Sequence, residues 1–325
     1  MNIFIPDDYQ GATKKLECLS VLDGHNITVL NHFSGLAKEL NDADVLVLIR
    51  ERTKITEALL SALPKLKLIS QTGKISNHLD LEACTKYGVA VAEGTGSPIA
   101  PAELAWSLIL NGKRQLPQAI AAMKEGRWQT NIGKALHGQT LGIWGYGKIG
   151  KRIANYAKAF EMKVMIWGSE NSQRNAEKDG HLVAKSKEHF FATADIVSLH
   201  LRLVDSTRHI VKATDLAMMK PGAMIVNISR AELIEENALV NALQKGRPGF
   251  AAVDVYEDEP VYNKNHPLLK MPNVICTPHL GYVEQTGFEL YFSKAFENII
   301  SFAKGNPLNI ANPEVLNAIT KSIPQ

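Results

Sequence analysis

Short apolar runs alternate with amphipathic segments along the whole chain. Runs that are apolar throughout are typical of parallel strands buried on both faces, and the segments between them are typical of helices that cover such a sheet. Before residue 93 the predicted strands are residues 2–6, 27–30, 44–49, 66–71 and 89–92. This pattern predicts a complete α/β domain in the first part of the chain.

The same alternation resumes after residue 140. The strands predicted there are residues 141–144, 164–167, 195–200, 224–228, 250–255 and 274–277. Six strands fit a doubly wound nucleotide-binding sheet. A helix is predicted over residues 236–245, closed by Gly246, and a longer helix over residues 284–304.

Two helical segments precede this second sheet, at residues 101–112 and 116–128. The first is apolar on nearly all of its faces, so it should be buried. A place in the core of its own domain and a place against a second subunit satisfy that pattern equally well.

A glycine- and proline-rich stretch at residues 93–98 predicts a hinge between two domains. Residues 98–284 then form a nucleotide-binding Rossmann domain. The tail after residue 308 is too short for a domain of its own, so we expect residues 285–325 to complete the domain begun by residues 1–97. The predicted fold class is α/β with two Rossmann-like domains, the first of them flavodoxin-like and discontinuous.

The segment GYGKIG at residues 145–150 stands between a predicted strand and a predicted helix. In that context the first glycine permits a tight turn, the second lets a pyrophosphate approach the backbone, and the third permits close helix packing. Free N–H groups and the positive end of the helix dipole favour phosphate there. A plain glycine turn is the alternative, but the flanking strand and helix favour dinucleotide binding.

Composition narrows the range of functions. The formal charge of +3 is small for 325 residues, and basic residues are scattered, so nucleic acid and membrane surfaces are not expected as partners. Cys18, Cys84 and Cys276 lie far apart without a C-x-x-C pair, which argues against disulfides and zinc and fits a reducing cytoplasm. We expect no metal, no signal peptide and a cytoplasmic location.

Arg230, Glu259 and His279 each follow a predicted strand of the nucleotide domain. Ligands bind outside the carboxyl ends of strands in open α/β sheets, so the three side chains are expected to converge. Each alone would be an ordinary loop residue. Together they suit proton transfer on an anionic substrate, because imidazole transfers protons near neutral pH, a carboxylate orients it and an arginine binds a carboxylate.

With these motifs the chain resembles the D-isomer-specific 2-hydroxyacid dehydrogenases, a family that includes D-3-phosphoglycerate dehydrogenase and glyoxylate/hydroxypyruvate reductases. The similarity extends over essentially the whole chain, through IRERTKIT, LISQTGKISNHLDLEACTKYGVAV, AEL, GYGKIG, DIVSLHL, MKPGAMIVNISR, AAVDVYEDEP and TPHLG. It implies hydride transfer between a nicotinamide cofactor and a D-2-hydroxyacid or 2-oxoacid, with Arg230, Glu259 and His279 as catalytic residues. It also implies that the discontinuous domain binds the substrate and that nucleotide domains pair in a homodimer.

The resemblance implies two further sets of residues. The cofactor-binding set is Gly145, Tyr146, Gly147, Lys148, Ile149, Gly150, Ser169, Glu170, His200, Leu201, Thr207, Ile228, Ser229, Asp254 and Gly281. The substrate-binding set is Arg50, Gly73, Lys74, Ile75 and Ser97. Backbone N–H groups of residues 72–75 are expected to bind the substrate's carboxylate. Arg50 and Lys74 either extend this site to a longer anionic acid or are solvated, and both alternatives stay open.

Several positions depart from the family pattern. NAD-specific members have an acid at the end of the second strand of the nucleotide domain, where this chain has Gly168. Ser169 and Arg174 would accept a 2′-phosphate, whereas Glu170 would hold the ribose and repel a phosphate, so NAD is expected with NADP as the alternative. The other departures, which leave the particular hydroxyacid open, are Ile75, Arg202 and Tyr282.

Two other functions fit the same fold. An NAD-sensing binding protein, similar to a transcriptional corepressor, would dock partners, but no docking patch or disordered arm is visible in the sequence. A formate dehydrogenase transfers hydride without a proton and needs no acid–base histidine; relatives of that kind carry glutamine where this chain has Glu259. Both rank below a hydroxyacid dehydrogenase.

Overall fold

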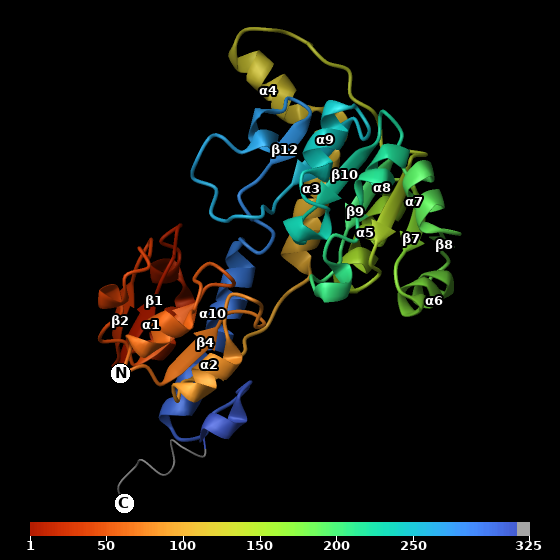
Figure 1. Cartoon of the computed structure of the whole chain (residues 1–325). Coiled ribbons are helices and arrows are strands. Elements are labelled where there is room, and N and C mark those ends of the chain that lie inside the picture. The colour runs from red at the N-terminus through yellow and green to blue at the C-terminus, as the bar shows by residue number, and fades with distance from the viewer. Residues whose placement is uncertain (317–325) are drawn as a thin grey trace, which may run out of the picture. The chain divides into compact units, whose positions relative to one another are not determined.

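The computed structural model describes residues 1–316 and divides the chain into two compact units. The first unit is Met1–Ser97 together with Glu284–Gln325, and the second unit is Pro98–Val283 (Figure 1). Residues 317–325, which the sequence analysis assigned to the discontinuous domain, lie outside the described residues.

A five-stranded parallel sheet forms the centre of the first unit. Its strands are β1 (Asn2–Ile5), β2 (Asn26–Val29), β3 (Val45–Leu48), β4 (Leu68–Gln71) and β5 (Ala90–Ala92). They lie in the order β2-β1-β3-β4-β5, and all neighbouring pairs are parallel. This is the strand order of flavodoxin-like sheets, as predicted.

Two short helices cover one face of this sheet. α1 (Glu57–Ser61) begins where the Thr56 side chain accepts the Leu59 N–H, and α2 (Leu81–Lys86) begins where the Asp80 side chain accepts a backbone N–H. Such caps satisfy N–H groups that have no partner inside the helix. Both helices pack on aliphatic side chains of the sheet in a single core.

The long helix α10 (Gln285–Ala303) packs on the opposite face, although it is far away in the sequence. On β4 the Ser70 hydroxyl donates a hydrogen bond to Ala295 O, 2.8 Å away. Phe292 and Phe296 of α10 are 1% and 0% exposed. The first unit is therefore a three-layer structure whose second covering layer comes from the end of the described chain.

The second unit contains a seven-stranded parallel sheet in the order β12-β11-β10-β9-β6-β7-β8. Its strands are β6 (Thr140–Trp144), β7 (Lys163–Trp167), β8 (Leu182–Val183), β9 (Ile196–Leu199), β10 (Met224–Asn227), β11 (Phe250–Val253) and β12 (Val274–Cys276). Six of these strands were predicted from the sequence, and β8 was not. That edge strand has two residues, and Leu182 is 62% exposed, so it produces no buried apolar run.

Helices cover both faces of this sheet (Figure 1). Those with side chains in the core on one face are α3 (Ile99–Arg114), α5 (Lys148–Ala159) and α6 (Glu170–Lys178). Those on the other face are α7 (Lys187–Thr193), α8 (Ala213–Met218) and α9 (Ala238–Gln244). The doubly wound α/β class predicted from the sequence is thereby confirmed.

The apolar helix predicted at residues 101–112 is α3. Its buried side chains belong to a hydrophobic core of the second unit. It approaches β10 so closely that a Cβ on Gly112 would lie 2.4 Å from the Met224 side chain. The chain then turns at Gln115, whose φ is +52°, into α4 (Leu116–Lys124). This second helix was predicted to reach residue 128, but it ends four residues earlier, before Gly126 with a φ of +74°.

Within residues 1–316, no helix is both long and apolar enough to span a bilayer. The same residues contain no cluster of three or more His, Cys, Asp or Glu side chains placed to hold a metal ion. Cys18, Cys84 and Cys276 are all free thiols.

Candidate active site

Gly145, Gly147 and Gly150 shape the turn between β6 and α5. Gly145 has a φ of +100°, and a Cβ there would lie 2.4 Å from His200 O. A Cβ on Gly150 would lie 2.2 Å from Gly145 O, so the helix contacts the turn directly. A Cβ on Gly147, the N-cap of α5, would meet no atom of the described chain within 4 Å. The turn therefore leaves space at its middle glycine, where a helix begins, and this suits a phosphate group.

Tyr146, between the first two glycines, is 5% exposed. Its hydroxyl donates to an Asp179 carboxylate oxygen at 2.9 Å, and Lys151 Nζ is 2.9 Å from the same oxygen. The Tyr146 side chain thus holds the residue that ends α6. Lys148 is exposed and Ile149 half-buried at the start of α5.

The end of β7, which pairs with β6, is the second part of the edge at which the sequence predicts dinucleotide binding. Gly168 there has a φ of +154°, and the Ser169 hydroxyl caps α6 by accepting the Ser172 N–H at 3.3 Å. Glu170 and Arg174, on the first turns of α6, are both exposed. An exposed acid and an exposed base at this end leave both NAD and NADP open.

His200, directly after β9, carries a buried ring nitrogen. Its Nε2 lies 2.9 Å from Ser198 Oγ, whereas no described residue bonds its buried Nδ1. Burial lowers the pKa of His200 to about 4, so the ring is neutral. A buried nitrogen of this kind fits a bound group that supplies its partner. Leu201 is half-buried beside Gly145, and the Thr207 hydroxyl closes the following turn by donating to Arg202 O at 2.7 Å.

The turn after β10 carries Arg230 and is organised by Asn227, which is 2% exposed. The Asn227 side chain accepts the Ser229 N–H at 3.0 Å and donates to Arg230 O at 2.8 Å. Ser229 Oγ donates to Leu199 O on β9 at 2.8 Å, and Arg230 Nη1 donates to Ser229 O at 2.6 Å. Ile228 is buried. Asn227 was not predicted from the sequence, because it is the last residue of a strand that is otherwise apolar.

Glu259 and His279 form a close pair, with His279 Nδ1 2.5 Å from Glu259 Oε2. The other carboxylate oxygen, Oε1, accepts the Tyr256 N–H at 2.8 Å. Because a carboxylate accepts, Nδ1 carries the proton and Nε2 is left to exchange a proton with another molecule. The His279 and Glu259 side chains are 22% and 30% exposed, so the pair is accessible. The Tyr282 ring packs edge-on against His279, with centroids 5.5 Å apart.

Tyr256 connects both members of this pair, and the sequence analysis missed it. Its N–H holds Glu259, while its hydroxyl donates to Thr277 O at 3.0 Å, two residues before His279. Burial raises the pKa of the Tyr256 hydroxyl, which therefore stays protonated as a donor. Tyr256 lies in the segment DVYEDEP, of which Asp254 and Glu259 were predicted as site residues.

Asp254, at the end of β11, holds the turn that carries His279. It is 0% exposed and accepts three hydrogen bonds, from Thr277 Oγ1 at 2.6 Å and from the N–H groups of Leu280 and Gly281 at 2.8 Å. Burial raises the pKa of the Asp254 carboxyl, against the lowering effect of these donors. Asp254 and Gly281, both in the expected cofactor set, therefore bind each other.

In the first unit, Arg50 and Gly73 lie together at the carboxyl ends of β3 and β4. Arg50 has a φ of +53°, and its N–H donates to Thr72 Oγ1 at 3.0 Å. A Cβ on Gly73 would lie 2.1 Å from Arg50 Nη1, so the guanidinium occupies the space that a side chain would fill. The Ser97 N–H donates to Tyr291 Oη at 3.3 Å.

Lys74 and Ile75 both bind the carboxylate of Glu93, whose role was not predicted from the sequence. Lys74 Nζ lies 2.7 Å from Glu93 Oε2, and the Ile75 N–H donates to Glu93 Oε1 at 3.0 Å. Two of the donors expected to bind a substrate carboxylate thus already bind a carboxylate of the chain itself.

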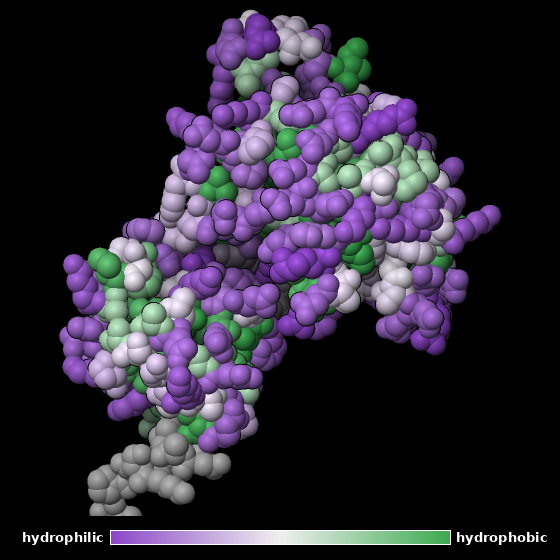
Figure 2. All heavy atoms as spheres, in the orientation of Figure 1, coloured by the Kyte–Doolittle hydropathy of each residue, from purple (hydrophilic) through white to green (hydrophobic). Residues whose placement is uncertain are grey.

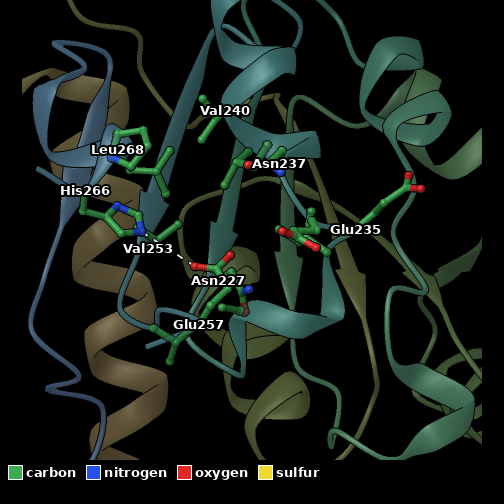
Figure 3. A pocket seen from close by; sticks show the side chains of 14 residues that line it. Asn227, Glu235, Asn237, Val240, Val253, Glu257, His266 and Leu268 are labelled. Atoms are coloured by element: carbon green, nitrogen blue, oxygen red, sulfur yellow. Dashed lines mark ion pairs between the residues drawn. The ribbon is translucent and has the colours of Figure 1, made fainter. Parts of the chain in front are cut away.

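A separate pocket of about 230 Å³ opens in the second unit, lined by residues of β10, β11, α9 and the turn before β12 (Figure 3). Glu257 and His266 face each other across it, with 3.6 Å between the carboxylate oxygen and Nε2. Arg230, Glu259 and His279 do not line this pocket, so it is not the place where the three side chains would act.

Comparisons with known proteins agree with this geometry. Residues 106–281 match the family model described as "D-isomer specific 2-hydroxyacid dehydrogenase, NAD binding domain". A solved structure of a putative D-3-phosphoglycerate dehydrogenase from Ralstonia solanacearum is 50% identical, with a TM-score of 0.94, and covers 97% of this chain and 98% of that chain.

Two curated relatives extend the comparison. Glyoxylate reductase of Aeropyrum pernix is 35% identical over 296 residues, which is 87% of each chain. D-3-phosphoglycerate dehydrogenase of Methanocaldococcus jannaschii is 40% identical over 256 residues, which is 76% of this chain and 48% of that protein. The chain therefore spans about half the length of the second relative and most of the first.

The doubly wound sheet with its glycine turn, together with the matched NAD-binding model, defines a nicotinamide-dependent oxidoreductase. More narrowly, the chain belongs to the D-isomer-specific 2-hydroxyacid dehydrogenase family. The resemblance noted from the sequence motifs is thereby confirmed.

Proposed function

We propose that this protein interconverts a 2-oxoacid and the corresponding D-2-hydroxyacid. The observation that carries the proposal is the 2.5 Å contact between His279 Nδ1 and Glu259 at the carboxyl ends of the strands. A paired imidazole is the group that such a reaction requires and that formate oxidation, which moves no proton, would leave without a role.

Each polar residue then has a part in the reduction. Nε2 of His279 donates a proton to the carbonyl oxygen of the 2-oxoacid as that oxygen becomes a hydroxyl. Glu259 holds the ring through Nδ1–H and stabilises its charged form. Arg230 binds the substrate's carboxylate or the developing charge on the oxygen. The bound nicotinamide supplies the hydride, or accepts it in the reverse direction.

Two separate groups of residues would hold the cofactor and the substrate. The cofactor's phosphates would lie at Gly147 and the start of α5, with the partner for His200 Nδ1 coming from the same molecule. The substrate's carboxylate would contact the loop that carries Gly73, beside the Arg50 guanidinium.

A panel of 2-oxoacids, assayed by the loss of NADH or NADPH absorbance, tests the proposal. We expect turnover of at least one acid, and we expect His279→Ala to lower kcat by roughly 10²–10⁴ while cofactor affinity is unchanged. Arg230→Ala should raise KM for the acid. Near-normal kcat/KM in His279→Ala, or turnover of formate without any 2-oxoacid, would contradict the assignment.

For the cofactor we propose NAD, with NADP tolerated. Gly168 removes the acid that usually excludes a 2′-phosphate, but Glu170 lies two positions further on and repels one. The ratio of kcat/KM for NADH and NADPH decides this. A strong preference for NADPH would show that Ser169 and Arg174 outweigh Glu170.

We also propose that the protein is a homodimer formed through the second unit. Apolar side chains stand exposed on α4 and just after it, and Figure 2 shows single hydrophobic residues among hydrophilic ones in this region. They are Ile120 (54% exposed), Met123 (58%), Trp128 (73%) and Ile132 (93%). Four exposed apolar side chains within one short segment are what a docking face would cover.

A further inference from the structure

The side-chain carboxylate of Glu93, directly after β5, binds the loop after β4 as the carboxylate of a bound acid would. One carboxylate oxygen accepts the Ile75 N–H at 3.0 Å, and the other lies 2.7 Å from Lys74 Nζ. A backbone N–H and an ammonium are the donors that would otherwise bind an anionic group of a substrate.

The backbone of Glu93 is fixed, so the carboxylate does not reach the loop by chance. Its N–H donates to Asn309 O at 2.9 Å, and its carbonyl accepts the Asn298 side chain at 3.1 Å. The next residue, Gly94, donates its N–H to Gly73 O at 2.8 Å. A Cβ on Gly94 would lie 2.3 Å from Gln71 O, so the strand end has no room to shift.

Each of the two cations near this loop is close to a carboxylate of the chain. Lys74 faces Glu93, and Arg50 Nε lies 3.7 Å from the Glu51 carboxylate. The Glu93 side chain is 28% exposed, so its charge is only partly screened by water. A substrate that brings a second negative charge to this loop meets two carboxylates as well as two cations.

We propose that Glu93 is a specificity-determining residue that makes this protein prefer 2-oxoacids with one negative charge over phosphorylated or dicarboxylic 2-oxoacids. This inference rests on the proposed function and narrows its substrate class. Single-charge acids are bound by the N–H groups near Gly73. Lys74 is already paired with Glu93, and Glu93 repels the second charge of a dianionic acid.

Glu93→Gln tests the inference with little structural change, because the amide oxygen still accepts the Ile75 N–H while the charge is removed. We expect kcat/KM for 2-oxoglutarate and for phosphohydroxypyruvate to rise roughly tenfold, with kcat/KM for glyoxylate changing less than about twofold. Lys74→Met is the matched control, because it removes a positive charge where Glu93→Gln removes a negative one. It should lower kcat/KM for the dianionic acids relative to kcat/KM for glyoxylate.

Equal gains for all three acids, or an unchanged ratio, would overturn the inference. Calorimetric titration with pyruvate and 2-oxoglutarate gives the same ratio for binding, without turnover. An inactive wild-type protein would therefore contradict the proposed function, while the binding ratio would still decide the role of Glu93. Unfolding midpoints of both variants show that their folds are intact.

Discussion

Tyr256 holds both members of the proton-transfer pair through two different groups. Its N–H fixes Glu259, and its hydroxyl fixes the carbonyl of Thr277 in the turn that carries His279. Removing the hydroxyl alone should loosen His279 while leaving Glu259 in place.

We therefore expect Tyr256→Phe to lower kcat for 2-oxoacid reduction by roughly three- to tenfold, the effect of one buried neutral hydrogen bond. The affinity for NADH, measured by fluorescence titration, should not change. Tyr262→Phe is the matched control, because this tyrosine of the same loop is 72% exposed. An unaltered kcat in Tyr256→Phe would mean that Asp254 alone positions the turn.

Site residues could be predicted from the sequence where position alone identifies them. Arg230, Glu259 and His279 could be proposed as a group because each follows a predicted strand, and parallel strands end at one edge. Tyr256 and Glu93 could not, because their roles depend on partners from neighbouring strands: Thr277 for Tyr256, and Lys74 and Ile75 for Glu93. Neither contact has a local sequence signal.

In the glycine turn between β6 and α5, one glycine leaves room for a ligand and another is needed for the packing of the protein itself. A methyl group on Gly147 would clash with no atom of the described chain, whereas a methyl group on Gly150 would clash with Gly145 O. The two positions therefore allow a matched pair of substitutions in one short segment.

We expect Gly147→Ala to weaken NADH binding by roughly tenfold or more with little change in the unfolding midpoint, because the methyl group meets the cofactor's phosphates. Gly150→Ala should instead lower the midpoint by several degrees, because the helix must move away from the turn. Thermal unfolding and NADH titration of both variants check this. Equal losses of stability would contradict the open geometry at Gly147.

Elements were predictable where apolar runs are long and buried. β9 and β10 are buried at every position, and their sequence runs identified them. β8 was lost because a two-residue edge strand shows no periodicity. α4 was predicted too long because Trp128 continues the apolar pattern beyond Gly126, where the structure shows the helix already ended.

The exposed apolar side chains near α4 suggest a test on the assembled protein. Trp128→Glu with Ile132→Glu should weaken the proposed dimer by roughly a hundredfold or more, because charged groups would be buried in its contact surface. Sedimentation velocity at several concentrations measures the change. Leu36→Glu in the first unit, at a position that is 52% exposed, is the control. A wild-type monomer, or a dimer unaffected by the double change, would exclude this face.

The discontinuous first unit affects the order in which the protein becomes complete. A chain synthesised from its N-terminus presents β1 to β5 early, but α10 is made only after the entire second unit. Until then the face of β4 that carries Ser70 has no helix upon it, and Phe292 and Phe296 have not yet been made. The second unit, continuous in sequence, is able to fold in the meantime. The unit that leaves the ribosome first can form its core against α1 and α2, but it is the last to cover the second face of its sheet.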